Sequence, residues 1–174
     1  ITFVKSDLFN SIEGKFDTII FNPPYLPQDK GIADAAIYGG KHGYETLQRF
    51  INSCSNYFKD AGIVLIVFSS RTSKQKVDEA IEKSCLEFEE LGQKRIFFET
   101  LYAYAIRKSP LLLQLQQKGI SNIALFEKGN RGVLYKGSYK GKTVVVKAKR
   151  KESRAVATVQ NEINWLTKLN EAGI

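Results

Sequence analysis

The chain has 174 residues, of which 43% are apolar and 25% are charged, a balance typical of a soluble globular protein. No apolar run approaches the roughly 20 residues of a membrane-spanning helix, so we expect a cytoplasmic protein with no membrane partner. The two cysteines lie far apart and the chain has one histidine, so we expect no metal site of the zinc type.

The net charge of +8 is confined to the last part of the chain. Residues 1–108 hold 14 Lys and Arg against 14 Asp and Glu, whereas residues 109–174 hold 12 against 4. Such a step predicts two units with different roles. We expect a first domain over 1–108, a connecting helix over 109–119 and a second unit over 120–174. Because the chain begins with Ile and contains no Met, we also expect it to be a piece of a longer or processed protein.

Strands and helices alternate in the first part of the chain. The apolar pattern predicts strands over 1–5 and 15–21, a helix over 44–58, a strand over 63–70, a helix over 73–85, and two antiparallel strands over 86–98 and 99–108. This order predicts an open, Rossmann-like α/β sheet. Ligands of such sheets lie beyond the carboxyl ends of the strands, which is where Asp7 and Asn22 fall.

The strand over 15–21 runs directly into Asn22-Pro23-Pro24-Tyr25, where proline ends it because it has no N–H for the ladder. This motif suits methyl transfer to a planar nitrogen, whose lone pair is delocalised. The Asn22 side-chain oxygen and the Pro23 carbonyl can accept its two N–H hydrogens, and Tyr25 offers a flat face. Pro23 and Pro24 fix φ and hold both acceptors in place. A rigid turn with no chemistry is the alternative.

These residues carry a resemblance to a known family. The stretches SDLF, FDTIIFNPPYLP, YGGKHGYETLQRFI and AGIVLIVFSS resemble the second half of class I S-adenosylmethionine-dependent methyltransferases. Within that class they are most similar to the release-factor glutamine N5-methyltransferases of archaeal and eukaryotic type. The resemblance covers residues 1–108.

The resemblance implies roles for particular residues. Asp7 would contact the adenosine part of S-adenosylmethionine, with Leu8 near the base. Asn22 and Pro23 would hold the target nitrogen beside the cofactor, and Tyr25 would flank it. The glycine-rich cofactor loop of the family would precede Ile1, so we expect this chain alone to bind the cofactor weakly or not at all.

The identity of the methyl acceptor stays open at this point. The Asn-Pro-Pro-Tyr motif also occurs in adenine-N6 methyltransferases, which extract a base from its stack and bring a basic surface for phosphates. The neutral charge of 1–108 favours a protein substrate such as a translation release factor, while the basic 109–174 segment leaves nucleic acid as an alternative partner. A non-catalytic scaffold is a third hypothesis. His42 and Glu45 either shape a substrate loop or, the interpretation we favour, form an ordinary polar loop and helix start.

Residues 109–174 have a different texture. We expect a helix over 109–120 with Pro110 in its first turn, three antiparallel strands over 120–150 and a helix over 153–174. Gly129 and Gly132 fall at a hairpin, where glycine lets backbone N–H groups approach phosphates closely. Lys147 lies on the third predicted strand and Glu162 on the following helix.

This segment resembles the small lobe of protein kinases, particularly small archaeal Ser/Thr kinase-like proteins, over 120–174. The resemblance implies that Lys147 pairs with the phosphates of ATP, with Mg²⁺, and that Glu162 holds this lysine in place. A basic hairpin domain that binds RNA is the alternative. The large-lobe motifs are absent from the chain, so we assign it no phosphoryl transfer.

Overall fold

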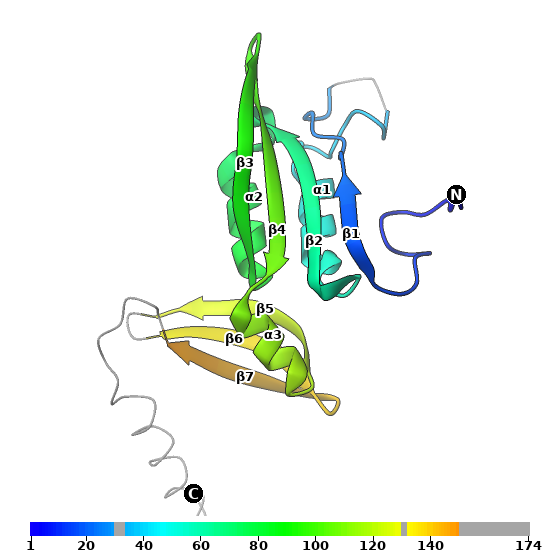
Figure 1. Cartoon of the computed structure of the whole chain (residues 1–174). Helices are drawn as coiled ribbons and strands as arrows, with labels where there is room; N and C mark the ends of the chain where they lie inside the picture. The colour runs from blue at the N-terminus through cyan, green and yellow to red at the C-terminus, as the bar shows by residue number, and fades with distance from the viewer. Residues whose placement is uncertain (30–33, 130–131, 150–174) are drawn as a thin grey trace, which may run out of the picture. The chain divides into compact units, whose positions relative to one another are not determined.

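The computed structural model describes residues 1–29, 34–129 and 132–149 of the chain (Figure 1). The chain divides into two compact units, Ile1–Ser121 and Asn122–Ile174. In the described part of the chain, no helix has the length and apolarity needed to cross a membrane. Asn22 belongs to the first unit and Lys147 to the second, so the two predicted sites lie in different units.

The first unit contains a mixed sheet. In chain order its elements are β1 (Phe16–Phe21), α1 (Glu45–Cys54), β2 (Phe58–Ser69), the 3₁₀ helix η1 (Ser70–Thr72), α2 (Lys74–Lys83), β3 (Leu86–Ile96), β4 (Glu99–Lys108) and α3 (Pro110–Gln117). The strand order is β1-β2-β4-β3, with β1 parallel to β2 and β4 antiparallel to both of its neighbours. The predicted α/β sheet and its antiparallel closing pair are confirmed.

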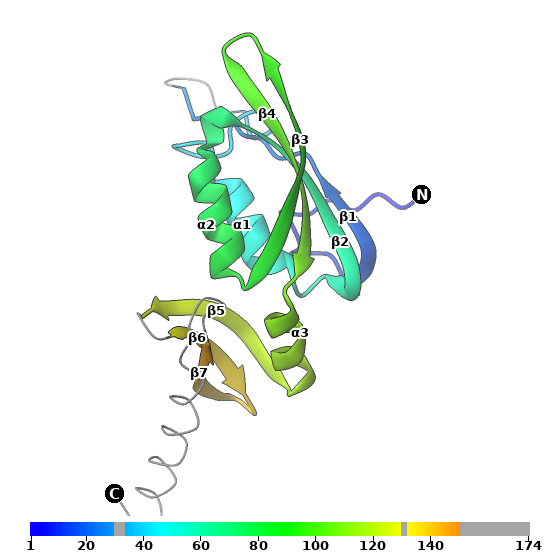
Figure 2. The same cartoon turned by 60° about the vertical axis from the view of Figure 1, so that its left-hand side comes forward.

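Apolar side chains at helical spacing bury one face of α1 and one face of α2. Both helices cover the same side of the sheet (Figure 2). The buried apolar residues include Leu47, Phe50, Ile51 and Cys54 of α1, Val77, Ala80 and Ile81 of α2, Phe58, Val64, Ile66 and Phe68 of β2, and Tyr104, Ala105 and Ile106 of β4. Each large side chain of this kind contributes about 1.5–3 kcal/mol relative to its exposed state. β1 pairs in parallel with β2, so their carboxyl ends meet at one edge of the sheet.

The strand predicted over 1–5 is wrong. No strand forms there, and Ile1 and Phe3 are exposed. A strand needs a hydrogen-bonded neighbour, and the described residues offer none beside this segment. Apolar character alone therefore did not make a strand.

The boundary between α1 and β2 also differs from the prediction. The helix expected over 44–58 ends at Cys54, and β2 begins at Phe58, which pairs with Phe16 of β1. The register then shifts, so that residues 59–62 bulge opposite Asp17. Gly62 fits there because a Cβ would lie 3.1 Å from the Asp17 carbonyl oxygen. Residues 59–62, which lie between the predicted helix and the predicted strand, thus form an irregularity inside a longer strand.

The connecting helix forms where it was predicted. The Ser109 side chain caps α3 by accepting a hydrogen bond from the Leu112 N–H at 3.1 Å, and Pro110 lies in the first turn.

The second unit contains a three-stranded sheet in the order β5-β6-β7, made of β5 (Ile120–Lys128), β6 (Gly132–Tyr139) and β7 (Lys142–Lys149). β6 and β7 are antiparallel and place Leu134 opposite Lys147. Their turn uses Lys140 and Gly141, both with positive φ, as a tight two-residue hairpin requires. The helix predicted over 153–174, including Glu162, lies outside the described residues.

Candidate active site

The motif that follows β1 forms the wall of a small pocket. The pocket has a volume of about 230 Å³ and is lined by Asn22, Pro23, Pro24, Tyr25, Leu26, Ala36 and Ile37. It lies at the carboxyl end of β1, the position at which ligands bind in sheets of this type. All four residues predicted from the motif therefore come together in one cavity.

The two predicted acceptors are the Asn22 side-chain oxygen and the Pro23 carbonyl. Within the part of the chain that the structure describes, the Asn22 side chain makes no hydrogen bond, and no backbone N–H outside the strands donates to the Pro23 carbonyl. Two residues after Pro23, the Tyr25 carbonyl accepts a hydrogen bond from the Thr72 hydroxyl at 3.1 Å. The loop is thus tied down by Tyr25, while the oxygens of Asn22 and Pro23 receive none of these hydrogen bonds.

A second loop clamps the motif from outside. The Leu26 N–H donates to the Ile37 carbonyl at 3.2 Å, and the Gly39 N–H donates back to the Leu26 carbonyl at 3.0 Å. The Gln28 N–H donates to the Gly40 carbonyl at 2.9 Å. These bonds give the loop after β1 an ordered partner, although it belongs to no sheet.

Glycine is required where this clamp is tightest. A Cβ on Gly39 would lie 2.4 Å from the carbonyl oxygens of Pro24 and Gly43. Gly43 has φ +86°, and a Cβ there would lie 2.7 Å from the Tyr25 carbonyl oxygen. Both positions therefore exclude larger residues for steric reasons, and Gly43 also for its backbone conformation. The spacing of these glycines in YGGKHG is the sequence signal for this clamp, and the periodicity of apolar residues does not reveal it.

His42 and Glu45 support the start of α1 and do not line the pocket. The Glu45 carboxylate accepts hydrogen bonds from the His42 N–H at 3.0 and 3.1 Å, and its Oε1 lies 2.8 Å from His42 Nδ1. Burial acts to raise the pKa of the Glu45 carboxyl, but the hydrogen bonds from His42 outweigh it and leave that pKa below its usual value. This arrangement fits the polar loop and helix start that we favoured.

Asp7 and Leu8 lie in an exposed loop and are not among the residues that line the Asn22 pocket. Asp7 Oδ2 pairs with the Arg49 guanidinium of α1 at 2.5 Å. Phe9, next to Leu8, stacks on Tyr57 with ring centroids 4.3 Å apart, which anchors the loop to the turn after α1. The cofactor contacts expected for Asp7 and Leu8 stay a prediction.

A three-residue bracket, which the sequence patterns did not predict, joins the motif to the start of β4. Its members are Ser69, Ser70 and Thr72, at the end of β2 and in η1. Thr72 holds the Tyr25 carbonyl, Ser70 Oγ accepts from the Thr100 N–H at 3.1 Å, and the Ser69 hydroxyl hydrogen-bonds to Glu99. The side chains of Ser69 and Thr72 are fully buried. This serine-threonine bracket therefore connects the pocket to the first residues of β4.

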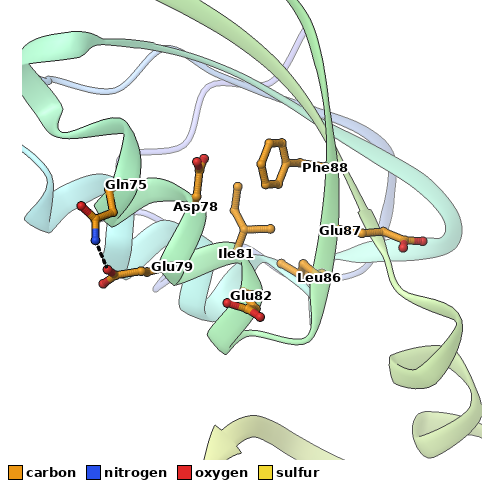
Figure 3. Close-up of a pocket in the computed structure, with 8 residues that line it drawn as sticks. All are labelled: Gln75, Asp78, Glu79, Ile81, Glu82, Leu86, Glu87 and Phe88. Carbon is orange, nitrogen blue, oxygen red and sulfur yellow. Dashed lines mark hydrogen bonds between the residues drawn. The ribbon is translucent and has the colours of Figure 1, made fainter. Parts of the chain in front are cut away.

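A larger cavity of about 440 Å³ lies between α2 and β3, away from the motif (Figure 3). It is lined by Gln75, Asp78, Glu79, Ile81, Glu82, Leu86, Glu87 and Phe88. Asp78 accepts a hydrogen bond from the Tyr104 hydroxyl at 2.9 Å, and Glu79 pairs with Lys76 at 3.0 Å. These carboxylates therefore already have partners. Among the described residues, no group of three or more acidic, His or Cys side chains is placed to hold a metal ion.

In the second unit, Lys147 lies against the glycine hairpin. The Gly129 N–H donates to the Gly132 carbonyl at 2.9 Å and closes the hairpin. A Cβ on Gly132 would lie 3.3 Å from Lys147 Cε, so the lysine stem crosses this glycine. The predicted partner Glu162 lies outside the described residues, and the resemblance of this unit to a kinase lobe stays a prediction.

Comparison with known proteins concerns the first unit. Residues 1–98 match the family described as methyltransferase small domain. The chain is 41% identical over 106 residues to a candidate protein N5-glutamine methyltransferase of Methanocaldococcus jannaschii, a match covering 58% of this chain and 54% of that protein. It is 32% identical over 75 residues to the release factor glutamine methyltransferase of Haemophilus influenzae, covering 38% of this chain and 26% of that enzyme.

A solved structure is also similar. It is the E. cuniculi Mtq2-Trm112 complex, described as responsible for methylation of the translation termination factor eRF1. The match has a TM-score of 0.51 and 28% identity, and covers 61% of this chain and 60% of that one. The chain thus spans about half the length of the first curated relative and less of the second.

Proposed function

Because this chain belongs to the methyltransferase small domain family, we propose that it forms the acceptor-binding part of an S-adenosylmethionine-dependent enzyme that methylates the side-chain amide of a glutamine in a protein. The observation that carries the proposal is the pair of unused acceptors, the Asn22 side-chain oxygen and the Pro23 carbonyl, in one pocket at the carboxyl end of β1.

The chemistry follows from the amide nitrogen. Its lone pair is delocalised into the carbonyl, so the nitrogen is a poor nucleophile. If Asn22 and Pro23 each accept one of its N–H hydrogens, the nitrogen is held with its lone pair free to face the methyl donor, and Tyr25 covers the flat amide. The cofactor, when bound, supplies a methyl group on a positively charged sulfur. Transfer of this methyl group would form a nitrogen–carbon bond as the sulfur–carbon bond breaks, and the surplus proton would leave to water, because neither acceptor is a base.

The residues that the structure describes fit the acceptor side of this reaction better than the cofactor side. The pocket offers two acceptors and an aromatic residue, which match a primary amide. Asp7 and Leu8 are the residues we propose for the adenosine part of S-adenosylmethionine. Asp7 is already held by Arg49, which would fix the direction of its carboxylate.

A translation release factor is the substrate we propose. The names of the related proteins support a glutamine in a protein, and two of them concern release or termination factors. The balanced charge of residues 1–108 supports the same choice, because a nucleic-acid substrate usually requires a basic surface.

The test is methyl transfer by the full-length protein, supplied with methyl-labelled S-adenosylmethionine and a purified release factor. We expect label on a glutamine, and a fall of about 100-fold with Asn22→Ala, the scale seen when one preorganised polar contact is removed. Asn56→Ala is the matched control, because Asn56 is exposed in the turn after α1. Label in nuclease-sensitive material would replace this proposal with adenine methylation. Absence of label from every substrate would favour the scaffold.

For the second unit, we propose a site for nucleotide phosphates at the glycine hairpin. The close approach of the Lys147 stem to Gly132 supports it. It brings a lysine to a glycine whose backbone N–H has room to approach a phosphate. ATP binding to the full-length protein with Mg²⁺ should weaken at least 10-fold with Lys147→Ala and stay unchanged with Lys142→Ala. Equal loss with both variants, or binding of RNA in place of ATP, would contradict the proposal.

A further inference from the structure

The hairpin that joins β3 to β4 ends in two exposed phenylalanines. Phe97 is 88% exposed and Phe98 is 92% exposed. Single exposed apolar residues are common on protein surfaces, but two adjacent large ones at the end of a projecting hairpin mark an interaction site. We call Lys94, Arg95, Phe97 and Phe98 the aromatic tip.

The backbone adds to this observation. Phe97 has φ +46°, a conformation that favours glycine and that a bulky side chain rarely adopts. A glycine at this place would relieve the backbone and remove an exposed ring. The presence of Phe there is therefore not explained by the stability of the turn.

The tip stands at the same end of the sheet as the Asn22 pocket. β4 is antiparallel to β2, and their last pair joins Leu101 to Ser69, the final residue of β2. Each residue of a strand adds a rise of about 3.3 Å, so residues 97 and 98 lie about 10 Å or more beyond the end of β2. Figure 1 shows the hairpin projecting past the ends of β1 and β2, on the side where the loop after β1 lies.

The base of the hairpin is fixed to the same support as the pocket. The serine-threonine bracket binds Glu99 and the Thr100 N–H on one side and the Tyr25 carbonyl on the other. A protein bound to the tip would therefore be held in a defined position relative to Asn22. A mobile arm would not provide this.

The charges near the rings indicate what they meet. Lys94 and Arg95 are exposed, and neither has an ion-pair partner within the described stretches. Glu99, the next acidic residue along the chain, hydrogen-bonds to Ser69 at the base of the hairpin and is not part of the tip. The tip is thus aromatic and cationic, and it complements an apolar recess bordered by carboxylates.

We propose that the aromatic tip docks the methyl-acceptor protein, with Phe97 and Phe98 buried in an apolar recess of that protein and Lys94 and Arg95 facing its carboxylates. The inference rests on the proposed function, since its occupant is the protein that carries the target glutamine. Two cations are few for binding nucleic acid, where affinity grows with the number of phosphates neutralised. Two rings that become fully buried match the aromatic anchors that dominate protein interfaces.

The test compares a whole acceptor with a short one. Full-length wild-type protein and the double variant Phe97→Ser/Phe98→Ser are assayed with the intact release factor and with a short peptide containing its target glutamine. We expect KM for the intact factor to rise at least 10-fold in the variant with kcat unchanged, and both constants for the peptide to stay the same. Leu91→Ser is the matched control, because Leu91 is 56% exposed on β3 but lies away from the tip.

Charge reversal gives a second readout. Lys94→Glu/Arg95→Glu should slow association with the factor and reduce its dependence on salt, whereas Arg107→Glu, an exposed cation at the other end of the hairpin, should not. An unchanged KM in the double Ser variant would overturn the inference while leaving the glutamine activity standing. A loss of RNA binding instead would assign the tip to nucleic acid. Failure of the wild-type protein to methylate any protein would overturn the proposed function itself.

Discussion

The two ends of the sheet in the first unit are held together differently. At the carboxyl end of β1, the loop is clamped by backbone hydrogen bonds and by Thr72, yet the oxygens of Asn22 and Pro23 have no protein partner in the described chain. At the opposite end, the fully buried Lys108 donates to Asp60 at 2.9 Å, and the Ser109 hydroxyl donates to the Cys85 carbonyl.

This difference separates stability from binding along the same strands. A buried polar group costs free energy unless it is hydrogen-bonded, so the end with satisfied groups stabilises the fold. The other end lacks such hydrogen bonds at Asn22 and Pro23, the residues that we propose bind the methyl acceptor. Substitutions at the two ends should therefore affect different measurements.

The largest effect is expected at the pocket end, from Gly43→Ala. The added Cβ would approach the Tyr25 carbonyl to 2.7 Å at a residue with φ +86°, and the motif must shift to relieve the contact. We expect methyl transfer by the full-length protein to fall by about 100-fold, because a misplacement of about 1 Å costs that much. Gly141→Ala is the control, since Gly141 has a similar φ of +77° and open space around it. Equal loss of activity in both variants would contradict the idea that the pocket end of the sheet is specifically responsible for methyl transfer.

At the other end, Lys108→Ala should reduce stability and leave activity intact. The substitution empties a fully buried site beside Phe58, whose ring centroid lies 5.4 Å from Lys108 Nζ. We expect the free energy of unfolding to fall by about 2–3 kcal/mol, as for other large-to-small core substitutions. Denaturant titration measures the loss, and activity per folded molecule is measured well below the new midpoint. A kcat that falls with stability would mean that the two ends are coupled.

The smallest effect is expected in the dependence of stability on acid pH. The hydrogen bond from Lys108 holds the pKa of the Asp60 carboxyl below its usual value. A carboxyl whose pKa is lowered by folding stabilises the protein above its unfolded pKa of about 4, and this contribution is lost as the pH falls through the folded pKa. Asp60→Asn should therefore lower Tm slightly at pH 7, and the variant's Tm should fall less than that of the wild type between pH 7 and pH 3. Glu13→Gln serves as the comparison, because Glu13 is exposed in the loop before β1. An identical acid profile for wild type and Asp60→Asn would contradict the assignment.

Much of the first unit could be predicted from local pattern. Helical spacing of apolar residues placed α1 and α2, and continuous apolar runs placed β1 and most of β2, because a side chain's burial follows from the period of its own element. The Asn22–Tyr25 motif was identified from adjacent residues alone. Such features depend on a few consecutive residues, so the sequence by itself determined them.

The remaining features depend on residues far apart in the chain, and only the tertiary structure decided them. The segment 1–5 is apolar, yet it forms no strand without a neighbour to pair with, and Phe58 joined β2 only because Phe16 lies opposite. The serine-threonine bracket unites Tyr25, Thr72 and Thr100 from three separate segments. The aromatic tip lies at the same end of the sheet as the pocket because β4 runs antiparallel to β2, so that β4 begins where β2 ends. Pairing direction and long-range hydrogen bonds have no local signature, since each partner's own neighbours are compatible with several arrangements.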